Sequence, residues 1–159
     1  MSTSPFSLLL EISKQDDGLP QIKALLKNNS TSSQLYHHSY MYQQSELLLF
    51  DSTGTQIKSY DYRERKDYDH TIYGKDSFHL LAPAEEVEID HSRLSIDQRG
   101  DHFLEWGPFQ FSSLKQGKYS AFLVFESYHD YWTDQKTKER HSLKIWAGKI
   151  ESNTIGFTI

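Results

Sequence analysis

The chain has 159 residues, no cysteine, and 17 Lys and Arg against 22 Asp and Glu, which gives a formal charge of −5. We expect one domain over residues 1–159 in a reducing, cytoplasmic setting, because the absence of cysteine excludes disulfides and thiolate metal sites. The acidic balance argues against a nucleic-acid partner, which needs a basic surface, and favours a partner with a basic protein surface. No apolar stretch approaches the ~20 residues that cross a bilayer, and the amino terminus lacks the basic start of a signal peptide, so no membrane is expected.

Short stretches of alternating apolar and polar residues begin near the amino terminus. Because successive strand side chains point to opposite faces, the alternation predicts strands at residues 8–12 and 22–26. The polar run 28–33 then predicts a turn. The second segment also fits a helix, since four of its apolar residues have helical spacing, namely Leu19, Ile22, Leu25 and Leu26.

A β-hairpin is expected next. Two apolar arms, residues 46–50 and 56–60, surround a turn that contains Gly54. The charged, tyrosine-rich stretch 60–75 that follows predicts a long loop or an irregular edge.

Two further strands are predicted on either side of Pro83, at residues 78–81 and 86–90. In the second of them Val87 and Ile89 share one face, and the opposite face is acidic, with Glu86, Glu88 and Asp90. The pattern of residues 94–106 is less clear, and a new strand is expected at Phe109 and Phe111.

The strongest local signal is the spacing of Leu114, Gly117 and Tyr119, which is typical of a tyrosine corner. In this motif a tyrosine near the start of a strand returns its hydroxyl group to the backbone upstream. Residues 119–125 are apolar on both faces, which predicts a central strand that is covered on both sides.

A charged run, residues 133–141, separates this strand from the last ones. We expect a strand that includes Leu143, Ile145 and Trp146, and a final strand at 155–159. The fold class predicted is all-β: a single immunoglobulin-like Greek-key sandwich of about seven to nine antiparallel strands with long inserted loops.

Four short motifs are similar to those of bacterial immunoglobulin-like domains: residues 26–29 (Leu-Lys-Asn-Asn), 81–83 (Leu-Ala-Pro), the tyrosine corner, and 152–159 (Ser-Asn-Thr-Ile-Gly-Phe-Thr-Ile). The chain therefore resembles a bacterial immunoglobulin-like or fibronectin-like sandwich, similar in outline to the intracellular proteinase-inhibitor (BsuPI-like) group. It departs from that pattern in its insertions at 60–75 and 128–141. The resemblance implies a folding framework and transfers no functional residue.

The residues give no sign of catalytic chemistry. There is no Gly-x-Ser-x-Gly elbow and no phosphate-binding glycine loop. No metal-binding spacing relates the eight histidines, which are His37, His38, His70, His79, His91, His102, His129 and His141. We therefore expect neither an enzyme nor a bound metal or cofactor.

Tyrosine, histidine and tryptophan concentrate near the ends of predicted strands, where sandwich folds place their binding loops. The candidate partner-binding residues are Tyr36, His37, Tyr40, Tyr42, Tyr62, Tyr68, Tyr128, Tyr131 and Trp132. Packing of these residues into the core is the alternative. The function predicted is a non-catalytic protein-binding module, for example an inhibitor or antidote for a basic enzyme or toxin. A carbohydrate-binding sandwich and a structural or assembly subunit remain alternatives, and the oligomeric state is left open.

Overall fold

The structure is a computed structural model that describes residues 4–38, 45–61 and 75–159. Apart from the short 3-10 helix η2, Lys75–Ser77, the regular elements of this part are β-strands, and their pairings are antiparallel. The strands are β1 (Phe6–Lys14), β2 (Pro20–Asn28), β3 (Gln34–His37), β4 (Ser45–Phe50), β5 (Gln56–Ile57), β6 (Tyr60–Asp61), β7 (Phe78–Leu81), β8 (Glu86–Ile96), β9 (His102–Trp106), β10 (Phe109–Leu114), β11 (Lys118–Ser127), β12 (Tyr131–Thr133), β13 (Arg140–Ser142), β14 (Gly148–Glu151) and β15 (Ile155–Thr158).

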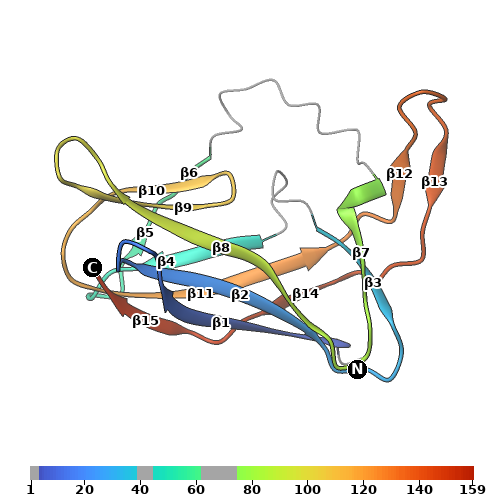
Figure 1. Cartoon of the computed structure of the whole chain (residues 1–159), viewed down its shortest axis with the longest axis horizontal. Coiled ribbons are helices and arrows are strands. Elements are labelled where there is room, and N and C mark those ends of the chain that lie inside the picture. Colours follow the sequence, from blue (N-terminus) through green and yellow to red (C-terminus); the bar gives the residue numbers. More distant parts are fainter. Residues whose placement is uncertain (1–3, 39–44, 62–74) are drawn as a thin grey trace.

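Two larger sheets contribute to one hydrophobic core (Figure 1). The first sheet has the order β1-β2-β8-β9-β10-β6, and the second has the order β14-β11-β4-β5, with β15 also paired to β11. Both sheets supply fully buried side chains: the first gives Leu26, Leu104 and Trp106, and the second gives Leu49 and Phe125. Two small sheets, β3–β7 and β12–β13, complete the structure.

The amino-terminal alternation forms the hairpin that it predicted. β1 and β2 pair over their whole length, from Phe6 opposite Asn28 to Lys14 opposite Pro20. Leu8, Leu10 and Ile22 point into the core, which settles the choice between strand and helix for the second segment. Burying one side of each strand removes apolar surface from water, and this is the main force holding the hairpin against the second sheet.

The all-β class is confirmed, but the structure does not show a single immunoglobulin-like sandwich of about seven to nine strands. The described residues form more strands than that, in several sheets. The order beside β2 also differs. In the immunoglobulin sheet order A-B-E-D, strand E pairs with the second strand and comes after strand D in the chain. Here β8 pairs with β2 and comes before β9, its neighbour on the other side.

The tyrosine corner has the expected hydrogen bond. The hydroxyl of Tyr119 donates to the carbonyl oxygen of Lys115 over 2.6 Å, and Leu114 is buried beneath it. Gly117 has a φ of 153°, and its N–H and C=O exchange hydrogen bonds with Ile159. The corner therefore fixes the start of β11 and the carboxyl end together. As predicted, β11 is a central strand, with β4 on one side and β14 and β15 on the other. In the described part of the chain the expected cover on both faces is not found, because Phe122 and Val124 on the second face are only half-buried.

A buried asparagine organises the corner between the first large sheet and the β3–β7 sheet. The Nδ2 group of Asn28 donates to the carbonyl oxygens of Ser32 and Leu81, both over 2.9 Å, and its Oδ1 accepts from the N–H of Ser30. Asn28 is fully buried. Its side chain satisfies the backbone groups that lose their ladder partners where the two chain segments turn together.

A second asparagine closes the outer edge of β1. The N–H of Leu10 donates to Oδ1 of Asn153 over 2.8 Å, and Nδ2 of Asn153 donates to the carbonyl oxygen of Leu10 over 3.2 Å. The side-chain amide therefore makes the two hydrogen bonds that a residue of an added strand would make.

The strand expected around residues 143–146 is wrong, because this stretch is irregular and the strand β14 begins only at Gly148. Trp146 instead packs edge-on against Phe6 with ring centres 5.0 Å apart, and the backbone N–H of Trp146 donates to the carbonyl oxygen of Leu35. The tryptophan lies so close to Gly148 that a Cβ atom there would come within 2.7 Å of its ring.

Candidate functional site

Two of the aromatic segments singled out in the sequence meet at one end of the molecule. His37 in β3 and His129 after β11 have ring centres 5.1 Å apart in a T-shaped contact. The N–H of His37 donates to Oγ of Ser127 over 3.0 Å, which fixes β3 against the end of β11. Residues separated by about ninety positions therefore form one surface, which we call the aromatic end: β3, β7, residues 127–130 and the β12–β13 hairpin.

The two candidates in β3 are core side chains. Tyr36 is 3% exposed and packs edge-on against Phe6 and Phe125, and His37 is fully buried. Burial raises the pKa of Tyr36 to about 12, with a smaller contribution from Glu85. In this conformation a partner cannot touch either ring. Tyr36 and His37 therefore follow the alternative given above, in which the candidate residues pack into the core.

His38, the next residue, is half-buried, and its Nε2 atom is enclosed. Its ring lies 5.7 Å from that of Phe125, and its Nε2 atom has no hydrogen-bond partner among the described residues. Burial, with a smaller contribution from His79, lowers the pKa of His38 to about 4. The imidazole is therefore neutral at neutral pH.

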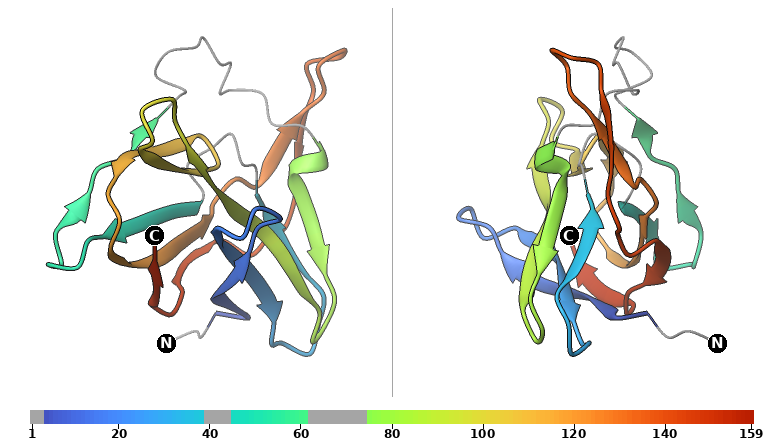
Figure 2. Two further views of the ribbon diagram at one scale, coloured as in Figure 1. Left: turned by 60° about the vertical axis from the view of Figure 1, so that its left-hand side comes forward. Right: turned by 90° about the vertical axis from the view of Figure 1, so that its right-hand side faces the viewer.

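The part of the aromatic end that extends away from the other strands is the β12–β13 hairpin (Figures 1 and 2). The charged run at residues 133–141 contains the turn of this hairpin and most of its second strand. On one side Trp132 stacks on His141, with ring centres 4.4 Å apart and an interplanar angle of 19°. On the other side the guanidinium carbon of Arg140 lies 3.6 Å above the centre of the Tyr131 ring.

The turn of this hairpin is well ordered by hydrogen bonds. The carboxylate of Asp134 accepts from the N–H groups of Lys136 and Thr137, and these bonds lower its pKa. The N–H of Asp134 donates to the carbonyl oxygen of Glu139. Lys138 takes a left-handed φ of 61°, which closes the turn. The hairpin is thus preorganised, although it pairs with no strand of the two larger sheets.

The remaining candidates divide into two groups. Tyr128, which is 45% exposed, lies at the base of the hairpin with its ring 4.3 Å from that of His129. Four other candidate residues lie outside the described residues: Tyr40, Tyr42, Tyr62 and Tyr68. Trp132 and Tyr131 are half-buried. Of the five candidates that the structure describes, three contribute to the aromatic surface, with Arg140 and His141 added.

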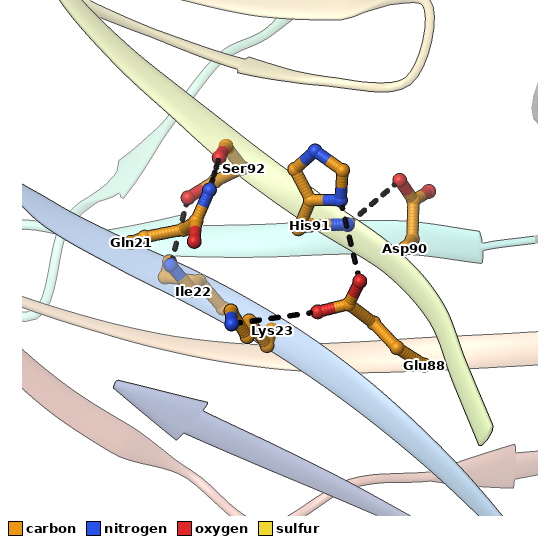
Figure 3. Close-up of polar contacts among 7 residues, drawn as sticks. All are labelled: Gln21, Ile22, Lys23, Glu88, Asp90, His91 and Ser92. Atoms are coloured by element: carbon orange, nitrogen blue, oxygen red, sulfur yellow. Dashed lines mark hydrogen bonds and ion pairs between the residues drawn. The ribbon is translucent and has the colours of Figure 1, made fainter. Parts of the chain in front are cut away.

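A polar seam between β2 and β8 was missed by the sequence analysis (Figure 3). The register shifts between Ala24 and Leu25, and this β-bulge reverses the inward and outward sides of β8. Val87 and Ile89 are partly buried before it, whereas Asp90, Ser92 and Leu94 turn inward after it. The prediction that Asp90 shares the solvent face of Glu86 and Glu88 is therefore wrong.

Asp90 joins the two larger sheets. One carboxylate oxygen accepts from Oγ of Ser45, at the start of β4, over 3.2 Å, and the other accepts from the N–H of His91 over 2.9 Å. Burial raises the pKa of this carboxyl group to about 6, although both hydrogen bonds favour its charged form. The fully buried Oγ of Ser92 accepts the N–H of Ile22 over 2.8 Å.

The outer surface of this seam is polar and charged. Glu88 lies 3.9 Å from Nζ of Lys23 and 3.7 Å from Nδ1 of His91. An open groove of about 560 Å³ runs beside them, lined by Lys14, Gln15, Asp16, Asp17, Gln21, Lys23, His91 and Arg93. Its lining includes both cations and carboxylates, which is typical of a solvated face. No sequence pattern revealed the seam, because a one-residue bulge leaves the residue types unchanged.

In the part of the chain that the structure describes, no three histidine, aspartate or glutamate side chains are grouped closely enough to hold a metal ion. The same part contains no helix of the length and apolarity that a membrane span requires. A scan against protein-family models finds no match for this chain, and a search of the curated proteins finds no significant relative. No family is therefore identified, and the likeness to bacterial immunoglobulin-like domains remains a resemblance.

Proposed function

We propose that this chain is a non-catalytic protein-binding module, and that the β12–β13 hairpin is its contact surface. The observation that carries the proposal is the position of Tyr131 and Trp132 on opposite sides of the hairpin, one under Arg140 and the other against His141. This hairpin extends from the molecule (Figure 2). Half-exposed aromatic rings held by neighbouring side chains supply large contact area with little loss of conformational freedom on binding.

The charge of the hairpin bears on the kind of partner. Residues 131–142 contain three cationic side chains (Lys136, Lys138 and Arg140) and two acidic ones (Asp134 and Glu139), so their formal charge is 3 − 2 = +1. The whole chain carries −5. The electrostatic attraction of a basic partner, such as a basic enzyme or toxin held by an inhibitor, would come from the body of the protein and not from the hairpin. The hairpin would add the aromatic contacts.

The framework under this surface is part of the proposal. The tyrosine corner, the shared core and the position of β11 between β4 and β15 support a two-sheet sandwich of immunoglobulin-like outline. The β8–β9 order, the larger number of strands and the two additional small sheets differ from it.

A photo-cross-linking amino acid placed at Gln135, in the hairpin turn, tests the proposal in cells that make the protein. The matched control places the same group at Asp16, which is exposed in the turn between β1 and β2 at another site. We expect a discrete cross-linked protein from position 135 alone. Trp132→Ala should abolish it and Trp132→Phe should restore it. Equal cross-linking from both positions, or none, would contradict the proposal.

A carbohydrate partner is the second candidate, and the flat, half-exposed ring of Trp132 favours it. Titration with soluble polysaccharides should then change the tryptophan fluorescence of the chain and leave that of Trp132→Phe unchanged. No fluorescence change with any polysaccharide would exclude this candidate and leave the protein partner.

A further inference from the structure

The outer edges of the sheets are protected to different degrees. At β1 the side chain of Asn153 occupies the backbone groups of Leu10, as described above. β5 and β6, at the far edges of the two larger sheets, are only two residues long. β7 differs from these, because it is four residues long and, within residues 4–38, 45–61 and 75–159, pairs with β3 alone.

The hydrogen bonds of β3 show which backbone groups of β7 face outward. The N–H of His38 donates to the carbonyl oxygen of Ser77, so these opposite residues form a hydrogen-bonded pair. Because such pairs alternate with non-bonded pairs along an antiparallel ladder, Phe78 and Leu80 direct their N–H and C=O groups away from β3. The far side of β3 agrees, since the carbonyl oxygen of Leu35, the residue opposite Leu80, accepts the N–H of Trp146.

The side chains of β7 do not guard this edge. Natural edge strands commonly use a charged residue, a proline or a bulge to prevent further pairing. The sequence of β7, Phe-His-Leu-Leu, contains neither a charged residue nor a proline, and its register with β3 is uninterrupted. Leu80 is 67% exposed, more than Leu9, Ile12, Ile96 or Tyr128.

We propose that β7 is a self-association edge, at which the chain pairs with a second copy of itself in a two-fold antiparallel arrangement. Centring the pair on His79 places Leu80 opposite Phe78 of the second copy, so the outward backbone groups of both residues find partners. The exposed leucine then packs beside an aromatic side chain, and the two His79 residues lie opposite each other at the centre of the pair. The β3–β7 sheets of the two copies then form one four-stranded sheet.

Sedimentation velocity of the whole chain over a range of concentrations tests the proposal. Because the added ladder is short, we expect a reversible dimer with a dissociation constant between about 10 µM and 1 mM. The backbone amides of Phe78 and Leu80 should exchange with deuterium more slowly as the concentration rises.

Two substitutions identify the edge. Leu80→Lys should abolish dimerisation, because the lysine introduces like charges at the pairing edge, and its exposed position lets the chain keep its fold. Leu80→Pro should do the same, because it removes an outward N–H and leaves the bonds to β3 intact. The matched control is Ile96→Lys, which charges another exposed hydrophobic residue, 55% exposed at the end of β8, and should leave dimerisation unchanged.

A wild-type chain that stays monomeric over this range, or a Leu80→Lys variant that dimerises as the wild type does, would overturn the proposal. The hairpin function does not depend on the result, because cross-linking at Gln135 uses a different strand pair. Cross-linking that fails while the dimer forms would reject the hairpin and leave the β7 edge standing.

Discussion

Beside the aromatic end and in the polar seam lie two half-buried groups, His38 and Asp90, that respond to pH in opposite directions. At the aromatic end burial lowers the pKa of His38 from 6.5 to about 4, whereas at the seam burial raises the pKa of Asp90 from 3.8 to about 6. Both environments disfavour the charged form. The charged form of histidine is the protonated one and that of aspartate is the deprotonated one, so the same physical cause produces opposite effects.

The consequence for stability follows from proton binding in the folded and unfolded states. Between about pH 4 and 6.5 the unfolded chain protonates His38 and the folded chain does not, so this group lowers stability as the pH falls. Between about pH 3.8 and 6 the folded chain protonates Asp90 and the unfolded chain does not, so this group lowers stability as the pH rises. The two contributions oppose each other over nearly the same pH interval. They therefore largely cancel in the pH dependence of the free energy of unfolding of the wild type.

The largest effect is expected from removing the titration of the aromatic end. His38→Phe should make the chain more stable at pH 4 relative to pH 7, by up to about 3 kcal/mol in comparison with the wild type, because the unfolded state no longer gains a proton. Phenylalanine suits the site, since the Nε2 atom has no described partner and Phe125 lies beside it. Urea unfolding at both pH values measures the difference, and an unchanged difference would show that His38 is hydrated in the folded state.

The converse change at the seam should be slightly smaller. Asp90→Asn should stabilise the chain at pH 7 by about 2 to 3 kcal/mol and change little at pH 4, because the wild-type carboxyl group is already neutral there. Ser45→Ala, which removes one hydrogen bond and no ionisable group, is the matched control. It should keep the pH dependence and raise the pKa of Asp90 further, because that bond favours the charged carboxylate. A stability change that is the same at both pH values would contradict the assigned burial of Asp90.

The corner that Asn28 organises, between the first large sheet and the β3–β7 sheet, gives a comparison that does not depend on pH. Asn28→Ala leaves the carbonyl oxygen of Leu81 and the N–H of Ser30 without side-chain partners at a buried site, which should cost about 2 kcal/mol. Asn29→Ala, one residue along, removes only an exposed hydrogen bond to Ser7 and should cost much less. Equal effects in chemical denaturation would show that Asn28 does not organise the corner.

The smallest effect is expected at the tyrosine corner, far from both titratable groups. Tyr119→Phe removes the hydroxyl that donates to Lys115 and keeps the ring packed on Phe157, so it should lower stability by about 1 kcal/mol at every pH. Thermal unfolding measures this change. A pH-dependent loss between pH 4 and 7 would mean that the corner is coupled to the buried charges.

Local patterns predicted the framework well because their causes are local. Alternation identified β1 and β2, and the Leu114–Tyr119 spacing identified the corner, since each depends on a few adjacent residues. The hairpin β12–β13 escaped prediction because its strands have three residues each and its turn depends on backbone bonds to Asp134.

The burial of individual site residues could not be read from the sequence. Tyr36 and His37 have the residue types of a binding loop, and they lie in the core because β3 packs against the end of β11, where His37 bonds to Ser127. Asp90 is inside because of a one-residue bulge opposite Ala24. Both outcomes depend on contacts between segments that are distant along the chain.

The hydrogen bonds between Leu10 and Asn153 join residues 143 positions apart, which has a consequence for synthesis on the ribosome. The edge of the first strand, with its apolar run Phe-Ser-Leu-Leu-Leu, is complete long before the asparagine that covers it has been translated. Closing so long a loop is slow in comparison with forming the local hairpin. The nascent chain therefore exposes a pairing-competent strand for most of its synthesis, and this interval is when binding by a chaperone would protect it most.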